Sequence, residues 1–203
     1  MTALDIMNDD HLNLSLSLSI GNNNPPKALP GIINDDHLNL SLSLSIGNNP
    51  VPKALPGIVH SYSYLKFKQI KTIQGEVQCK HCEKIFQVEF DLKNNFEIVE
   101  KFIARNKANM YWRAAEEWMK PVLPNCEFCQ TENCAKPVKT KEISEINWLF
   151  LLLGQMLGCC TLKELKYLCK HYRKHRSGAK DRVLYISYLT LCNQFQPRQL
   201  FSS

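Results

Sequence analysis

The chain has 203 residues, 44% of them hydrophobic, which is typical of one globular domain with tails. Its formal net charge is +6, yet residues 1–60 hold two lysines and five aspartates, so an acidic segment precedes a basic body. The start lacks the basic region of a signal peptide, and nine cysteines then indicate a reducing, intracellular compartment. The longest apolar run, residues 148–153, is too short to cross a bilayer, so we expect no membrane partner.

A direct repeat with a period of 26 residues occupies the N-terminal segment. NDDHLNLSLSLSIGNN at residues 8–23 recurs unchanged at 34–49, and KALPGI at 27–32 recurs with the same offset. Two copies are too few to bury a continuous solenoid core, and Asn- and Pro-rich spacers separate them. The sequence therefore predicts a disordered arm over residues 1–60 and a folded domain over 61–200.

Each copy of the repeat contains leucines that alternate with asparagine and serine. In an extended chain these leucines share one face, so each tract is expected to dock on a groove or sheet edge of a partner. The pattern resembles the Leu-x-Leu-x-Leu repression motif of plant transcriptional regulators, which implies a Topless-type co-repressor as partner and a nuclear, otherwise cytoplasmic, location. Low-complexity sequence, or two strands that pair with each other, explains the same residues. The candidate partner-binding residues are Leu12, Leu14, Leu16, Leu18, Leu38, Leu40, Leu42 and Leu44.

Two Cys-x-x-Cys pairs lie in the part of the chain that is expected to fold. Residues 71–78 and 85–90 are rich in β-formers and flank the first pair, and two prolines precede the second. The two-residue spacer lets a short turn direct two thiolates at a common point, so two such turns complete a tetrahedral sulfur shell around zinc. The predicted zinc ligands are Cys79, Cys82, Cys126 and Cys129.

Zinc is not the sole chemistry that these cysteines allow. They can be ordinary buried or redox-active thiols, ligands of an iron–sulfur cluster or, least readily in a reducing cell, disulfides. Cys134 lies five residues after Cys129 and can replace either member of the second pair. We favour the alternative in which Cys134 is not a ligand, because a Cys-x-x-Cys turn is the better donor pair. His81, inside the first pair, is expected to point away from the metal.

Five helical segments are predicted around and after the cysteines. Asp91 caps the first, and Thr161 with Glu164 forms a capping box at the start of the fourth. The third is apolar nearly all round and should be central. The fold class is therefore α+β: a small zinc-ribbon-like β module with an inserted helix and a C-terminal helical cluster, preceded by the disordered arm. The expected helices span about 93–107, 110–119, 146–157, 161–174 and 181–194.

The segment 161–182 carries eight lysines and arginines against two acidic residues. It can lie along a phosphate backbone, and a solvated helix face that ends in a basic loop explains the same residues. His171 and His175, close to Cys169, allow a second metal site, although such residues more often have packing or surface roles. The candidate phosphate contacts are Lys170, Arg173, Lys174, Arg176, Lys180 and Arg182.

Catalytic motifs are missing from the sequence. It contains no phosphate-cradling glycine loop, nucleophile elbow or paired-carboxylate motif, and no base is arranged beside a thiol. Free cysteine is among the most buried residue types, so the remaining thiols are expected to fill the core. These thiols are Cys159, Cys160, Cys169 and Cys192. We expect neither enzymatic activity nor a small-molecule substrate.

Four stretches resemble an uncharacterised family of plant proteins defined by a domain of unknown function: IKTIQGEVQCKHCEK, PVLPNCEFC, INWLFLLLGQMLGCCTLKELKYLCK and HRSGAKDRVLY. The resemblance covers about residues 68–197 and implies a plant source and a zinc-ribbon-like fold, but no catalytic residue. The leading hypothesis is a non-enzymatic nuclear adaptor that recruits a co-repressor through the arm. A nucleic-acid-binding zinc module that uses residues 161–182 is the alternative, and a thiol-dependent enzyme is the third.

Overall fold

The computed structural model describes residues 57, 59–138, 140–175 and 177–201. The chain divides into two units, residues 1–47 and 48–203, and every described residue belongs to the second. The predicted disorder of the arm and the roles of its eight leucines therefore fall outside the described residues. At the arm's end, the Gly57 N–H donates to the Ile146 carbonyl (3.0 Å), and Val59 is buried.

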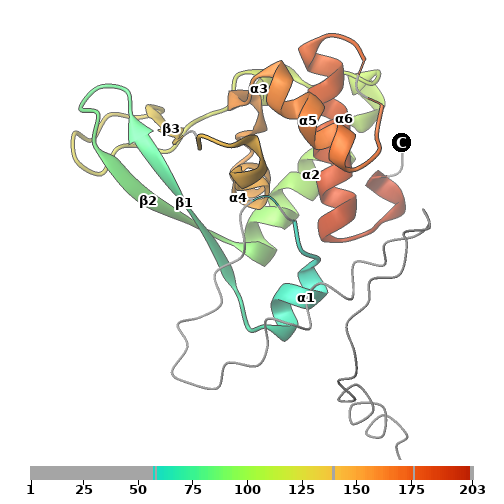
Figure 1. The fold of residues 1–203 in the computed structure, drawn as a ribbon, viewed down its shortest axis with the longest axis horizontal. Coiled ribbons are helices and arrows are strands. Elements are labelled where there is room, and N and C mark those ends of the chain that lie inside the picture. Colours follow the sequence, from blue (N-terminus) through green and yellow to red (C-terminus); the bar gives the residue numbers. More distant parts are fainter. Residues whose placement is uncertain (1–56, 58, 139, 176, 202–203) are drawn as a thin grey trace, which may run out of the picture. The chain divides into compact units, whose positions relative to one another are not determined.

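A three-stranded antiparallel sheet with several helices confirms the predicted α+β class (Figure 1). β1 (Thr72–Cys79) and β2 (Ile85–Asp91) form a hairpin and match the two predicted strands to within one residue. β3 (Ala135–Pro137) pairs with the other edge of β1, which gives the order β2-β1-β3. The sequence did not predict β3, because three residues at the start of a polar stretch show no alternation.

The inserted helix begins where β2 ends. Asp91 is the last residue of β2 and the N-cap of α2 (Leu92–Met110): its Oδ1 accepts the Asn94 N–H at 2.7 Å. The predicted cap is confirmed, and the helix extends beyond the predicted 93–107. One face of α2 packs into the core through Leu92, Phe96, Val99, Ile103 and Met110.

The predicted helix over 110–119 is wrong for its first half. Met110 is the last residue of α2, and after it only α3 (Glu116–Met119) is helical, because Tyr111 and Trp112 both adopt left-handed backbone conformations, with φ of 45° and 63°. These two residues end α2 and turn the chain before α3. Glycine or asparagine usually occupies such positions, so two aromatic residues give no sequence signal of the break.

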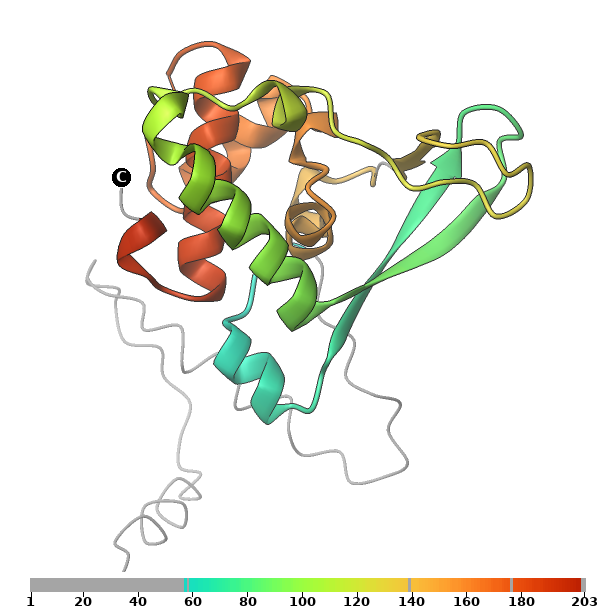
Figure 2. The ribbon, with the colours of Figure 1, turned by 180° about the vertical axis from the view of Figure 1, so that it is seen from behind.

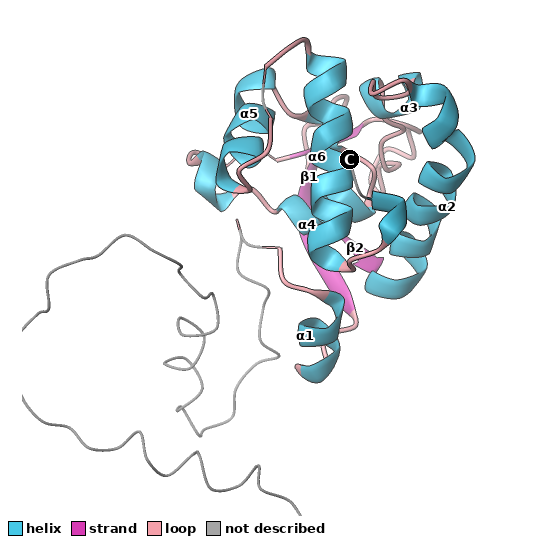
Figure 3. Cartoon of the chain, turned by 90° about the vertical axis from the view of Figure 1, so that its right-hand side faces the viewer, coloured by secondary structure: helices cyan, strands magenta, loops and turns pink. Residues whose placement is uncertain are grey.

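The apolar block forms α4 (Trp148–Leu153), whose six side chains are all buried, as its sequence predicts. It contacts β1, α2 and α6, and so lies between the sheet and the other helices (Figure 3). The helix is shorter than the predicted 146–157. The Asn147 side chain caps its start by accepting the Phe150 N–H (3.1 Å), and Gly154 ends it before the 3-10 turn η4 (Leu157–Cys159).

Two further helices complete the C-terminal cluster. α5 (Leu162–His171) packs against α6 (Lys180–Phe195), as Figure 2 shows. The predicted capping box at Thr161 and Glu164 is confirmed. A short helix, α1 (Tyr62–Phe67), and the 3-10 turns η3 (Ile143–Glu145) and η5 (Gln199–Phe201) were not predicted. Among the described helices, none has the length and apolar character needed to cross a membrane.

Gly75 in β1 marks the point where the sheet meets α4. A Cβ on Gly75 would lie 2.5 Å from the Phe150 ring, so Gly75→Ala should overpack the core and lower the free energy of unfolding by about 1–3 kcal/mol. Urea denaturation followed by circular dichroism measures this loss. Combining Gly75→Ala with Phe150→Leu should cost less than the sum of the two single substitutions, since the smaller side chain makes room. An unchanged midpoint for Gly75→Ala would contradict the contact.

Candidate metal centre

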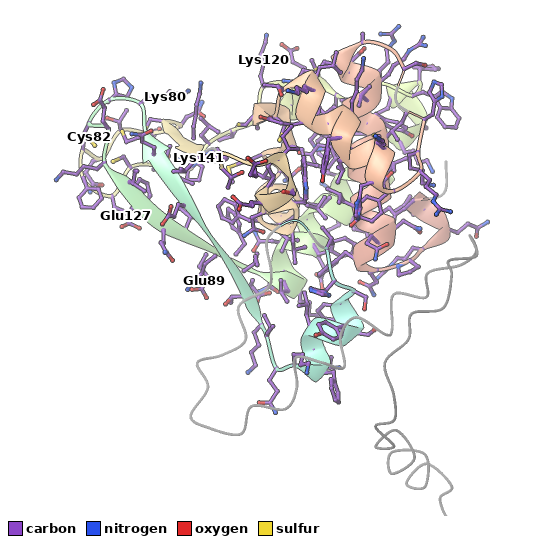
Figure 4. All side chains as sticks on the ribbon, in the orientation of Figure 1. Lys80, Cys82, Glu89, Lys120, Glu127 and Lys141 are labelled. Atoms are coloured by element: carbon purple, nitrogen blue, oxygen red, sulfur yellow. The ribbon has the colours of Figure 1, made fainter. Side chains whose placement is uncertain are left out.

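The first cysteine pair lies at the tip of the β1–β2 hairpin, where Figure 4 shows the labelled Cys82 among the sulfur atoms. Cys79 is the last residue of β1, and its N–H donates to the Lys84 carbonyl (3.0 Å). Glu83 adopts a left-handed conformation (φ 58°), which lets the chain turn tightly before β2. The hairpin therefore places Cys82 beside Cys79.

The second cysteine pair lies in the loop between α3 and β3. Two backbone hydrogen bonds close this loop: the Cys126 N–H donates to the Thr131 carbonyl (2.9 Å), and the Gln130 N–H donates to the Cys126 carbonyl (3.0 Å). β3 then fixes the loop against the hairpin, because the Lys80 N–H donates to the Cys134 carbonyl (3.0 Å). Sheet formation and cysteine convergence are thus linked.

The four sulfur atoms of the two pairs form one group. The Sγ atoms of Cys79 and Cys129 are 3.6 Å apart, those of Cys82 and Cys126 are 3.5 Å apart, and all four lie within 4.8 Å of one another. In a tetrahedral site with Zn–S bonds of about 2.3 Å, neighbouring sulfurs are about 3.8 Å apart. The group can therefore hold a metal ion.

Backbone amides prepare part of this group for the thiolate state. The N–H groups of Cys82 and His81 lie 3.4 Å and 3.3 Å from the Cys79 Sγ and lower the pKa of this thiol to about 6. The pKa of Cys129 is also lowered, first by its hydrogen bond with the Thr131 side chain (3.2 Å). Both thiols are thus disposed to bind a cation as thiolates.

The Cys82 thiol has the opposite tendency. The Lys84 N–H lowers its pKa, but burial and the neighbouring Cys126 thiol outweigh this effect and raise the pKa to about 12. Removing a proton from Cys82 beside other thiolates places like charges close together. A bound divalent cation offsets that repulsion, so the mixture of lowered and raised pKa values suits a metal centre.

Cys134 lies beside the group without belonging to it. Its buried Sγ is 3.6 Å from the Cys79 Sγ and donates to the Thr131 carbonyl at 3.0 Å. Burial is the main reason that its pKa is raised, which favours the neutral thiol. These contacts fit the interpretation in which Cys134 packs against the ligand Cys79 and is not itself a ligand.

The Cys-x-x-Cys spacing identified the four cysteines that converge in the structure, but it did not identify most of the residues around them. Thr131 contacts Cys129 through its hydroxyl and Cys134 through its carbonyl, and no spacing rule singles it out. Phe128, half-exposed, packs edge-on against Phe86 (6.0 Å), and the Lys84 ammonium lies 4.5 Å above its ring. The polar character of residues 136–145 hid β3, the strand that fixes this loop. His81 is exposed, as expected.

The candidate phosphate contacts are not equivalent in the structure. Lys170, Arg173, Lys174 and Arg182 are exposed. Lys180 is half-buried and donates to the Gly158 carbonyl (2.7 Å), so it joins α6 to η4 rather than facing a partner. Arg176 lies outside the described residues.

The remaining thiols differ in how exposed they are. Cys169 is buried with its Sγ 3.6 Å from the Ser187 hydroxyl, whereas His171 and His175 are exposed. Cys160, Cys169 and Cys192 are buried in the core, and burial raises the pKa of Cys192. Cys159 is half-buried. The expectation of core filling is confirmed for the three buried thiols.

A cavity of about 530 Å³ lies between β1 and the segment that leads into α4 and α5. Phe150 and Leu151 are among its apolar lining residues, and Lys141 and Glu145 are among its charged ones. This composition does not favour one class of ligand, because the lining carries both signs of charge.

Fold and site together define a small α+β domain with a four-cysteine centre that can hold a metal ion. The chain belongs to the family of the domain of unknown function DUF7086, whose sequence model matches residues 62–195. This range contains both cysteine pairs and the apolar block, so it confirms the resemblance seen in the sequence. No curated protein and no solved structure matches the chain.

Cysteine-to-serine substitutions should distinguish the four candidate ligands from the neighbouring Cys134. Cys82→Ser is expected to abolish stoichiometric metal binding and to lower the thermal midpoint, because metal binding contributes folding free energy. Cys134→Ser, a substitution of the same kind 3.6 Å from a ligand sulfur, should keep one metal per chain. Elemental analysis and thermal denaturation measure both variants. Metal loss in Cys134→Ser with retention in Cys129→Ser would show that Cys134 is the fourth ligand.

Metal affinity should rise with pH. The pKa of Cys82 is about 12 in the metal-free protein, so its proton must leave when the metal binds. Protons therefore compete with the metal, and the apparent affinity for Co²⁺ should increase at least about tenfold per pH unit between pH 7 and 8.5. The thiolate-to-cobalt absorption band, titrated against a chelator of known pH dependence, reports this slope. A flat profile would contradict a site that includes Cys82.

Alkylation should distinguish the exposed thiol of the centre from the core thiols. Cys129 is exposed and has a lowered pKa, whereas Cys169 and Cys192 are buried. After chelator treatment, iodoacetamide should label Cys129 first, and metal should protect it. Mass spectrometry of the digested protein gives the order of labelling. Rapid labelling of Cys169 or Cys192 in the native protein would contradict their core position and support the thiol-enzyme hypothesis.

Proposed function

We propose that this protein is a non-enzymatic zinc-binding adaptor in transcriptional repression. The four-thiol group carries the zinc part of the proposal, because four protein ligands complete a tetrahedral shell. Such a shell leaves no position for a water molecule, which is the pattern of structural and not of catalytic zinc. The metal would stabilise the hairpin tip and the 124–134 loop against each other.

Metal identity is tested directly. Protein purified without added metal should contain about one zinc per chain and show no visible absorption. An iron–sulfur cluster would instead colour the protein and place iron and sulfide in the analysis. Either finding leaves the four-cysteine geometry intact but decides the chemistry of the centre.

The leucine arm supplies the recruitment part of the proposal, and its support comes from sequence alone. A tract with all its leucines on one face requires a partner surface, and the tract resembles a motif that Topless-type co-repressors bind. Two tracts on one arm would bind a partner with several grooves more tightly, because the second event takes place at high effective concentration. The proposed location is the nucleus.

The recruitment test uses solution binding to the groove-bearing N-terminal domain of a Topless-type co-repressor. The full chain and a peptide of residues 34–49 should both bind, the peptide in the micromolar range, and Leu40→Ser with Leu42→Ser should abolish peptide binding. In the full chain the same pair leaves the first tract intact, so affinity should fall to that of a single tract. Failure of both the chain and the peptide to bind would reject recruitment while leaving the zinc centre untouched.

A second candidate function is nucleic-acid binding by the folded domain. The observation in its favour is that four of the six candidate phosphate contacts are exposed on α5, on α6 and in the loop between them. Binding of DNA or RNA at low salt, weakened as salt rises, would support it. No binding at 50 mM salt would reject it.

A further inference from the structure

The turn after α2 exposes two large aromatic side chains next to each other. Tyr111 is 79% exposed and Trp112 is 63% exposed, whereas Trp118 and Trp148 are almost fully buried. Both exposed residues also adopt left-handed backbone conformations, which are unfavourable for residues with a Cβ. Both aromatic rings therefore lie in solvent, and their backbone adopts a conformation that is unfavourable for residues of this type. We call residues 111–113 the aromatic turn.

Specific contacts hold the aromatic turn against the start of α6. The Arg113 guanidinium pairs with the Asp181 carboxylate, and the Ala114 N–H donates to the Asp181 carbonyl (2.9 Å). The Trp112 ring meets the Tyr185 ring edge-on at 6.2 Å. These contacts therefore fix the backbone of the aromatic turn, which carries the two exposed aromatic side chains.

Charged side chains of both signs surround the aromatic turn, and the exposed Glu117 on the following helix α3 is one of them. Arg182 is exposed, and it shares a helix face with Tyr185 three residues later, so it lies on the side of α6 that meets Trp112. Arg113 neutralises Asp181, the acidic residue of this helix start. In Figures 1 and 2 the α5–α6 loop lies at the same end of α6 as the turn. Arg173 and Lys174 belong to this loop and are exposed. On the neighbouring α3, Glu116 pairs with Lys120 (2.9 Å).

Exposed aromatic rings together with exposed arginine and lysine side chains match the chemistry of an unstacked nucleic acid. Bases stack on exposed rings, while arginine and lysine follow the phosphates, and this combination binds single strands with little sequence preference. A duplex hides its base faces, so the rings would add nothing to duplex binding. We propose that the aromatic turn binds single-stranded nucleic acid together with the exposed cations Arg173 and Lys174 of the α5–α6 loop and Arg182 of α6. This inference rests on the second candidate function and names its ligand class and stacking residues.

The test measures binding of the full chain to fluorescein-labelled 20-nucleotide DNA and RNA single strands at 50 mM salt. Trp112→Ala should weaken binding by about 5- to 100-fold, the range for loss of one stacked base. Trp112→Phe should stay within a few-fold of the wild type, because a stacking face remains. Phe67→Ala is the matched control, since Phe67 is 80% exposed on the distant α1 and its loss should have no effect.

Intrinsic fluorescence gives an independent readout. Trp112 is the exposed one of the chain's three tryptophans, so stacking of a base should quench its emission, and Trp112→Phe should remove this quenching while binding persists. A triple variant, Arg173→Ala, Lys174→Ala and Arg182→Ala, should weaken single strand, duplex and inorganic polyphosphate alike. Trp112→Ala should weaken the single strand alone.

Each contrary outcome has a distinct meaning. If the triple variant loses binding but Trp112→Ala behaves like Phe67→Ala, nucleic-acid binding stands and the stacking inference falls. If the wild type binds neither strand nor duplex, both fall. If a glutamate-rich peptide binds more tightly than nucleic acid and Trp112→Ala weakens it equally, the surface serves an acidic protein, and the inference is overturned.

Discussion

The packing of α4 against β1 joins the two halves of this domain. Phe150 lies directly on the backbone of β1 because residue 75 is glycine, and the same helix contacts α2 and α6. Since all six apolar side chains of α4 are buried, every side of the helix packs against another part of the domain. Its position is therefore set by all of these neighbours together. The hairpin that carries the cysteines is therefore supported at its base by the core and at its tip by the 124–134 loop.

Much of this arrangement could be predicted from local signals. Richness in β-forming residues identified β1 and β2, Asp91 and Thr161 identified helix starts, and the Cys-x-x-Cys spacing identified the four sulfurs that converge. Each of these signals depends on residues close in sequence, where periodicity and capping act. The sequence also indicated that α4 is central, because a helix that is apolar on every side must be buried on every side.

The features that sequence reasoning missed depend on contacts between distant segments. β3 exists because β1 offers it an edge, and Thr131 acquires its role only when the loop closes on Cys129 and Cys134. The break at Tyr111 and Trp112 is similar, since the anchors that hold it are Asp181 and Tyr185, about seventy residues away. Local propensity favours a continued helix there, and tertiary contacts override it.

The double role of Asp91 constrains how the domain can vary in length. Because one residue ends β2 and caps α2, no spacer separates the strand register from the helix start, and the Leu92 N–H also bonds back to Lys71 (2.9 Å). An insertion between residues 85 and 92 would turn the buried side of the strand outward or displace the cap. The number of residues from Ile85 to Asp91 should therefore stay constant among relatives, so that the strand register and the helix cap are both kept.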